Sequence, residues 1–136
     1  MEKSYVVVVQ CAKATDAVCP GFLCEHAFNA RIDAFAGYPA ERPMRYNAIS
    51  CGGCPGRAVL RKLVNLKKNL KKRENIEAGS IVAHLSTCIA KPSHHGPRCP
   101  HADYIKAQIG RAGLPAVEGT RFSPRAEARR RDGIYP

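Results

Sequence analysis

The seven cysteines are the residues of this sequence best suited to chemistry. Their number is odd and amounts to about one residue in nineteen, below the roughly 8–10% that marks a disulfide-stabilised secreted domain. In a reducing compartment, such a number of thiols indicates metal ligands or redox chemistry rather than disulfides. The sequence therefore predicts a thiol-rich functional site.

Two of the cysteines form the motif Cys51-Gly52-Gly53-Cys54. The two glycines let the backbone turn tightly and bring both sulfurs to one point. Such a pair suits a thiolate site for zinc, an iron–sulfur cluster or a redox-active dithiol. The sequence lacks paired C-x-x-C motifs with zinc-finger spacing, so the remaining ligands must come from distant loops.

The same segment permits an enzymatic alternative. Cys51 and Arg57 have the spacing of the nucleophile and the arginine in the anion-binding loop of a phosphatase or arsenate reductase. Such loops usually place a hydroxyl residue after the arginine, whereas this chain has Ala58. A thiol-based reductase of disulfides or oxyanions, or a phosphatase-like enzyme, is thus the alternative to a metal-binding protein, and the sequence leaves open whether a reaction is catalysed.

Three cysteines precede a proline, in Cys19-Pro20, Cys54-Pro55 and Cys99-Pro100. Proline is favoured at the first helical position, so this pattern predicts that each cysteine caps a helix. The free N–H groups and the positive end of the helix dipole lower the pKa of a thiol there. Thiolates are the form that binds metals and attacks disulfides.

The histidines divide by position. His101 lies two residues after Cys99 and is the one histidine that we include among the metal ligands. His84 lies within an apolar run, which predicts a hydrogen-bonded core residue. The pair His94–His95 predicts a polar loop, and the role of His26 stays open.

The elements that must position these residues follow from the apolar pattern. Short apolar or β-branched runs predict four strands: Ser4–Gln10, Met44–Ser50, Ser80–Ser86 and Leu114–Glu118. Helical spacing predicts three helices: Phe22–Ala36, Arg57–Arg73 and Ala102–Ala112. This alternation predicts a single α/β domain of the flavodoxin or Rossmann-like type, with a mainly parallel four-stranded sheet and helices on both faces.

This arrangement gathers the cysteines. Three of them, Cys11, Cys51 and Cys88, lie just beyond the carboxyl ends of predicted strands, and the others lie in the next loops or first helical turns. All seven therefore belong at the carboxyl edge of the sheet, where open α/β folds bind their ligands. The metal ligands that we expect first are Cys11, Cys51, Cys54 and Cys88. The second group is Cys19, Cys24, Cys99 and His101.

The order and spacing of these motifs resemble the CGGC-domain family of small prokaryotic proteins. The resembling points, from about residue 5 to residue 121, are Val8–Cys11, Cys19-Pro20-Gly21 with Cys24, Cys51-Gly52-Gly53-Cys54-Pro55-Gly56, Leu85–Ile89, Cys99-Pro100-His101 and Val117–Thr120. The resemblance implies a metal-binding domain, with zinc as the suggested metal, and implies no reaction. A Gly-Thr-His sequence is expected at the last point, but Arg121 stands in place of the histidine.

The charge composition indicates which classes of partner to expect. The chain has 22 Lys and Arg against 11 Asp and Glu, a net charge of +11, which favours anionic partners. The basic runs Lys67–Arg73 and Arg125–Arg131 contain no interleaved aromatic residues, so we do not expect nucleic-acid binding. The expected partners are a metal ion and a protein that transfers electrons or delivers metal.

The sequence also gives expectations for the cellular location, the domain boundary and the C-terminal segment. The longest purely apolar run, Tyr5–Val9, is too short to span a membrane, so a cytoplasmic protein is expected. Residues 1–121 are expected to form the metal-binding α/β domain. Residues 122–136 are basic and lack apolar periodicity, which predicts a mobile tail.

Overall fold

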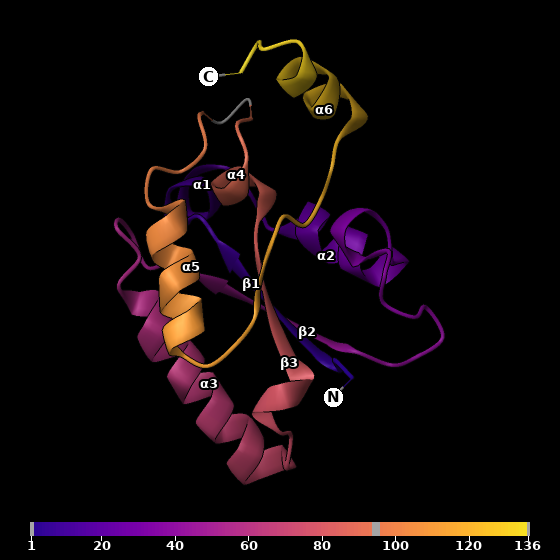
Figure 1. The fold of residues 1–136 in the computed structure, drawn as a ribbon, viewed down its shortest axis with the longest axis vertical. Coiled ribbons are helices and arrows are strands. Elements are labelled where there is room, and N and C mark those ends of the chain that lie inside the picture. The colour runs from indigo at the N-terminus through magenta and orange to yellow at the C-terminus, as the bar shows by residue number, and fades with distance from the viewer. Residues whose placement is uncertain (1, 94–95, 136) are drawn as a thin grey trace.

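The computed structural model describes residues 2–93 and 96–135 and shows a parallel sheet between two layers of helices (Figure 1). Its four strands are β1 (Tyr5–Gln10), β2 (Arg45–Ser50), β3 (Ile81–Leu85) and β4 (Ala116–Glu118). They lie in the order β2-β1-β3-β4, and every pairing is parallel. This order matches the first four strands of the flavodoxin-like arrangement. The predicted α/β class and parallel sheet are confirmed.

The strand register aligns the carboxyl ends of β1, β2 and β3. Gln10 of β1 pairs with Ser50 of β2, and Val9 pairs with Leu85 of β3. The next residues continue the alignment, because the N–H of Cys51 donates to the carbonyl of Gln10 at 2.9 Å. The segments that follow β1, β2 and β3 therefore leave the sheet at one edge.

The helices are α1 (Ala12–Ala17), α2 (Phe22–Ala30), α3 (Ala58–Glu74), α4 (Thr87–Ala90), α5 (Ala102–Arg111) and α6 (Pro124–Arg131), with short 3₁₀ turns η1 (Asp33–Phe35) and η2 (Ala78–Ser80). The predicted first helix is wrong beyond Ala30, because Arg31 takes a left-handed conformation with φ of 55° that ends α2. The sequence analysis missed α1 and α4. Both follow strands directly and are too short to display helical periodicity.

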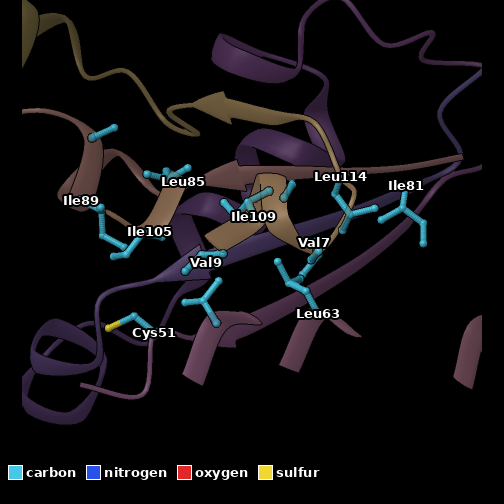
Figure 2. Close-up of a cluster of buried hydrophobic side chains, with 14 of the residues drawn as sticks. Val7, Val9, Cys51, Leu63, Ile81, Leu85, Ile89, Ile105, Ile109 and Leu114 are labelled. Atoms are coloured by element: carbon cyan, nitrogen blue, oxygen red, sulfur yellow. The ribbon is translucent and has the colours of Figure 1, made fainter. Parts of the chain in front are cut away.

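The core has two parts, one on each face of the sheet. The larger part lies between the sheet and helices α3 and α5, and Figure 2 shows Val7, Val9 and Leu63 within it. The smaller part lies on the α2 side, where Val6 and Val8 pack with Phe35. Every residue of β1 is buried, as expected of a continuously apolar strand covered on both faces.

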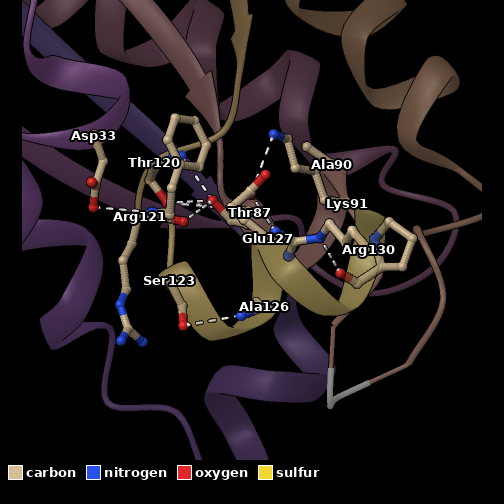
Figure 3. Close-up of polar contacts among 12 residues, drawn as sticks. Asp33, Thr87, Ala90, Lys91, Thr120, Arg121, Ser123, Ala126, Glu127 and Arg130 are labelled. Atoms are coloured by element: carbon tan, nitrogen blue, oxygen red, sulfur yellow. Dashed lines mark hydrogen bonds and ion pairs between the residues drawn. The ribbon is translucent and has the colours of Figure 1, made fainter. Parts of the chain in front are cut away.

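The C-terminal segment contains a helix that the sequence pattern does not reveal. α6 begins after Ser123, whose Oγ accepts a hydrogen bond from the N–H of Ala126 at 3.3 Å (Figure 3). No residue of α6 is buried, so the helix has no apolar face to produce periodicity. Arg130 donates to the carbonyl of Pro92 at 2.6 Å and ties α6 to the rest of the chain. The domain boundary at residue 121 stays a prediction.

Across the described ranges, the helices are either too short or too polar to cross a lipid bilayer.

Candidate thiol site

The carboxyl edge of the sheet gathers the cysteines. Burial is the main cause that raises the pKa of Cys24, Cys88 and Cys99, and charges on neighbouring cysteines raise it further. The neighbours that act in this way are Cys11, Cys19, Cys51, Cys54 and Cys88. Each of the seven cysteines is therefore within electrostatic range of another, and all seven are free thiols.

The two faces of the sheet divide the cysteines. Cys51 is 6% exposed and belongs to the larger core, and three partly buried cysteines pack against that core: Cys11, Cys88 and Cys99. Cys24 packs instead against the smaller core on the α2 side. Cys54 is exposed to solvent. The seven cysteines thus influence one another electrostatically, but they pack on different faces of the sheet.

Backbone N–H groups donate to three of the sulfurs. Ala12 donates to Cys51 across the edge at 3.3 Å. Gly21 donates to Cys19, and His101 donates to Cys99, each at 3.4 Å. N–H groups directed at sulfur stabilise thiolates and tune metal–thiolate centres.

The predicted helix-capping role of the Cys-Pro pairs is wrong. The residues that cap α2, α3 and α5 are Gly21, Arg57 and His101. Proline has no N–H, so the first backbone donor after Cys19 and after Cys99 is the residue two positions later, and it donates to the sulfur. Moreover, the pKa of Cys99 is raised by burial rather than lowered.

The third Cys-Pro pair is built differently. Cys54-Pro55 is a cis peptide, and the N–H of Gly56 donates to the carbonyl of Gly53 at 2.8 Å rather than to the sulfur of Cys54. Gly52 takes a φ of 78°, and a Cβ added there would lie 2.5 Å from the Cβ of Ala58. The first glycine of the motif is thus required by both its conformation and its contact with α3.

Side-chain hydroxyls bond two further sulfurs. The Oγ of Ser86 lies 3.0 Å from the sulfur of Cys88, and the Oγ1 of Thr120 lies 3.1 Å from the sulfur of Cys24. Both contacts lower the pKa of the thiol against the effect of burial. The sequence analysis missed Ser86 and Thr120 as site residues, although Ser86 directly follows β3 and Thr120 lies in the last segment of the family pattern.

An open cavity of about 580 Å³ adjoins the Cys-Gly-Gly-Cys loop. The residues that line it are Gly52, Gly53, Cys54, Pro55, Arg57, Ala58 and Arg61. Cys51 does not line it, because its buried sulfur accepts the N–H of Ala12. The N–H of Gly52 donates to the Oγ of Ser50 at 2.9 Å and is not directed into an anion cradle. The cysteine that lines this cavity together with Arg57 is Cys54.

The histidines have separate environments. His84 is fully buried, with Nδ1 2.9 Å from the carbonyl of Gly119 and Nε2 2.8 Å from the hydroxyl of Tyr38, so the predicted core role is confirmed. A carbonyl only accepts, so Nδ1 carries the proton and Nε2 accepts from Tyr38. Burial lowers the pKa of His84. His26 is exposed and its ring lies 5.6 Å from that of Phe22, while His94–His95 lies outside the described residues.

The sulfurs are near one another without converging. In residues 2–93 and 96–135, no three His, Cys, Asp or Glu side chains meet as a ready metal-binding group. The ligand set expected from the sequence therefore stays a prediction.

Comparison with known proteins places the chain among prokaryotic relatives. The family model of the CGGC domain matches residues 5–121. One uncharacterized protein of Methanocaldococcus jannaschii is 27% identical over 122 residues, which cover 85% of this chain and 84% of the relative. A second uncharacterized protein of that organism is 32% identical over 77 residues, covering 56% of this chain and 98% of the relative. No solved structure matches the chain.

Proposed function

Because the chain belongs to the CGGC-domain family, we propose that it binds a metal ion through cysteine thiolates at the carboxyl edge of its sheet. One observation carries the proposal. Five of the seven sulfurs are hydrogen-bonded to an N–H or a hydroxyl group at 3.0–3.4 Å. Such donors surround the sulfurs of metal–thiolate centres, where they orient the ligands and spread their charge.

The ligand set that packing favours is Cys11, Cys51, Cys88 and Cys99, since all four contact the larger core. Four thiolates complete a closed zinc site, which stabilises a fold. Cys54 lies outside this group as an exposed thiol, and His101 contributes its N–H to Cys99. An iron–sulfur cluster is the alternative cofactor for the same four thiolates.

Loading the site requires two local changes. The sulfurs must rotate about χ1 toward a common point, because no three of them converge in the described part of the chain. The ligating thiols must also lose their protons, and burial holds the pKa of Cys88 and Cys99 above the ordinary value of 9.0. Metal binding therefore releases protons and weakens as the pH falls.

The cavity beside Cys54 favours one second candidate function. Arg57 and Arg61 line it and form no ion pair or hydrogen bond with the described residues. A thiol-based enzyme acting on an oxyanion or a disulfide would use Cys54 with these two arginines, rather than Cys51 with Arg57. In either function, the protein would act with an electron-transfer or metal-delivery partner.

Metal counting on protein purified without oxygen tests the main proposal. We expect one zinc per chain without colour, or iron with visible absorption if the site holds a cluster. Cys51→Ser should lose most of the metal, because it removes the most buried of the four ligands. Cys24→Ser is the matched control on the other face and should keep it.

Cys54→Ser and Cys99→Ser identify the fourth ligand, since only the variant that removes a ligand should lose metal. Equal metal content in wild type, Cys51→Ser and Cys99→Ser would overturn the proposed site. Metal-free protein in which arsenate protects Cys54 from alkylation, with protection lost in Arg57→Ala, would favour the enzyme.

A further inference from the structure

The exposed side of α3 carries cations that the rest of the described chain leaves unpaired. α3 contains seven Lys and Arg residues, and an eighth, Arg57, caps it. Four of the eight donate hydrogen bonds to neighbouring groups: Lys62, Lys67, Lys71 and Arg73. The other four form no hydrogen bond or ion pair with any described residue, and all are exposed: Arg57, Arg61, Lys68 and Lys72.

The four unpaired cations lie on one side of the helix. Their positions fall within an arc of about 60° and along about 22 Å of a helix with 3.6 residues per turn. Val59, Leu63 and Leu70 are buried on the opposite side, in the larger core. Val64 lies among the cations and is 41% exposed. α3 runs along the outside of the molecule (Figure 1), and we call its exposed residues Arg57, Arg61, Val64, Lys68 and Lys72 the α3 stripe.

No carboxylate of the described chain pairs with the α3 stripe. α3 contains no acidic residue before Glu74, which pairs with Arg45, and the next one, Glu77, pairs with Lys71. Two pairs of stripe cations are four residues apart, a spacing at which like charges destabilise a helix. Carboxylates from a partner would relieve this repulsion, so the stripe is complementary to an acidic surface.

A cavity lies at each end of the α3 stripe. Arg57 and Arg61 line the cavity beside the Cys-Gly-Gly-Cys loop, together with the exposed Cys54. Lys68 and Lys72 line a second cavity of about 470 Å³. Side chains of a partner can therefore fill the surface at both ends, and a partner that does so lies beside a thiol that is open to solvent.

An acidic protein fits the α3 stripe better than a nucleic acid or a membrane does. Val64 gives the stripe an apolar centre within a charged rim, which is the usual anatomy of a protein interface. Residues 57–74 include no aromatic side chain, so the bases of a single strand would find no stacking platform. The apolar face of α3 is buried in the core, so the helix has no free apolar face to insert into a lipid surface.

We propose that the α3 stripe is the docking surface for an acidic protein, which it holds beside the exposed thiol of Cys54. The cations bind carboxylates of this partner, and Val64 contacts an apolar residue among them. The inference deepens the proposed function and rests on it in one respect, because it takes the docked protein to be the electron-transfer or metal-delivery partner. Docking itself requires no metal at the site of Cys51.

Fluorescence anisotropy with a defined probe tests the docking surface on the full-length protein. The probe is a labelled helical peptide that repeats Glu at the spacing of the four cations and places Leu opposite Val64. Its control is a peptide of the same composition in scrambled order. At an ionic strength of about 0.15 M, where charges more than about 8 Å apart are screened, we expect the ordered peptide to bind and the scrambled peptide to bind roughly tenfold more weakly or not at all.

Charge reversals locate the binding surface. Arg61→Glu with Lys68→Glu should weaken binding of the ordered peptide by roughly tenfold or more, because each reversal replaces an attraction with a repulsion. Arg121→Glu with Arg125→Glu makes the same change of net charge at exposed residues of the C-terminal segment, and it should alter binding by less than about twofold. Equal binding of the two peptides, or equal loss in the two double variants, would overturn the docking surface.

Val64→Thr distinguishes a protein partner from the other anionic partners. It keeps the shape of the side chain and removes apolar contact, so it should weaken peptide binding by roughly fourfold. Duplex DNA and phosphatidylserine vesicles should bind more weakly than the peptide. Tighter binding of DNA or vesicles through the stripe, unaffected by Val64→Thr, would overturn the proposal in favour of a nucleic acid or a lipid surface.

A chloroacetyl group on the peptide tests the position of Cys54. Because Cys54 lies beside one end of the stripe, a group at an end of the docked peptide should alkylate it roughly tenfold faster than a group at the centre. Arg61→Glu with Lys68→Glu should remove this difference, and equal rates from the end and the centre in the wild type would overturn the placement of the partner beside Cys54.

Metal content is measured on the same preparations, so the two proposals fail separately. Normal metal content without peptide binding would overturn the docking surface alone. Peptide binding by protein that holds no metal would support the docking surface and overturn only the site at Cys51.

Discussion

The two faces of the sheet differ in the donors that they offer to their most buried thiols. On the α3 and α5 face, the sulfur of Cys51 receives a backbone N–H from Ala12, and Cys99 receives one from His101. On the α2 face, the sulfur of Cys24 instead lies 3.1 Å from the side-chain hydroxyl of Thr120. Backbone donors persist through substitution of the residue that carries them, whereas side-chain donors do not. The donors to Cys51 and Cys99 are therefore fixed by the fold, whereas the contact of Cys24 with Thr120, like that of Cys88 with Ser86, is open to tuning by single substitutions.

Among substitutions that act on one face of the sheet, Phe35→Ala is expected to have the largest effect on stability. Phe35 is fully buried on the α2 side, and its ring lies 4.5 Å from that of His84. Removing it should lower the free energy of unfolding by about 3–5 kcal/mol, as for other buried aromatic residues. Urea denaturation measures this loss, and the folded fraction of the variant should keep the metal bound on the Cys51 face.

The exposed Ile32 is the matched control, and Ile32→Ala should change the free energy of unfolding by no more than about 0.5 kcal/mol. Loss of the metal from folded Phe35→Ala would mean that the two faces act as one unit.

A smaller effect on the same face is expected when the pH is lowered and His84 gains a proton in the unfolded chain. Burial lowers the pKa of His84 below the 6.5 of the unfolded chain. Between these two pKa values the unfolded chain binds more protons than the folded protein. The contribution of His84 to the free energy of unfolding is therefore complete above pH 6.5 and is lost as the pH falls toward the folded pKa. Denaturation of metal-free protein from pH 8 to pH 5 measures this slope.

His84→Asn keeps a donor toward Gly119 and removes the titration, so it should flatten the slope. Glu118, whose pKa the hydrogen bond from Arg98 lowers below 4.5, acts only at more acidic pH. An unchanged slope in His84→Asn would assign the pH dependence to another group.

The smallest effect is expected from removing residues 123–136, whose described part, 123–135, contains only α6 and the turn after it. Their contacts include an ion pair between Lys91 and Glu127 at 3.7 Å and the hydrogen bond from Arg130 to Pro92. Such contacts contribute about 1 kcal/mol in total. The truncated chain should keep both its metal content and its fold by circular dichroism, and a loss of several kcal/mol would move the domain boundary beyond residue 121.

The sequence predicts the fold well because its strongest signal is local. The run at Val6–Val9 has the composition of a strand buried on both faces, and the cysteines that follow the strands locate the site edge. The division of the site between faces could not be predicted. It depends on contacts such as that between Cys24 and Thr120, which are 96 residues apart. Spacing along the chain carries no information about such pairs.

The segment 119–122 closes the domain late in the chain. The N–H of Gly119 donates to the carbonyl of Leu85 at 2.7 Å, that of Phe122 to the Oδ2 of Asp33 at 3.0 Å, and that of Ala34 to the carbonyl of Thr120 at 3.1 Å. During translation, Cys24 emerges from the ribosome long before Thr120 is made. Cys24 therefore lacks its contact with Thr120 for most of the synthesis, and that contact forms only after nearly all of the domain has been released from the tunnel.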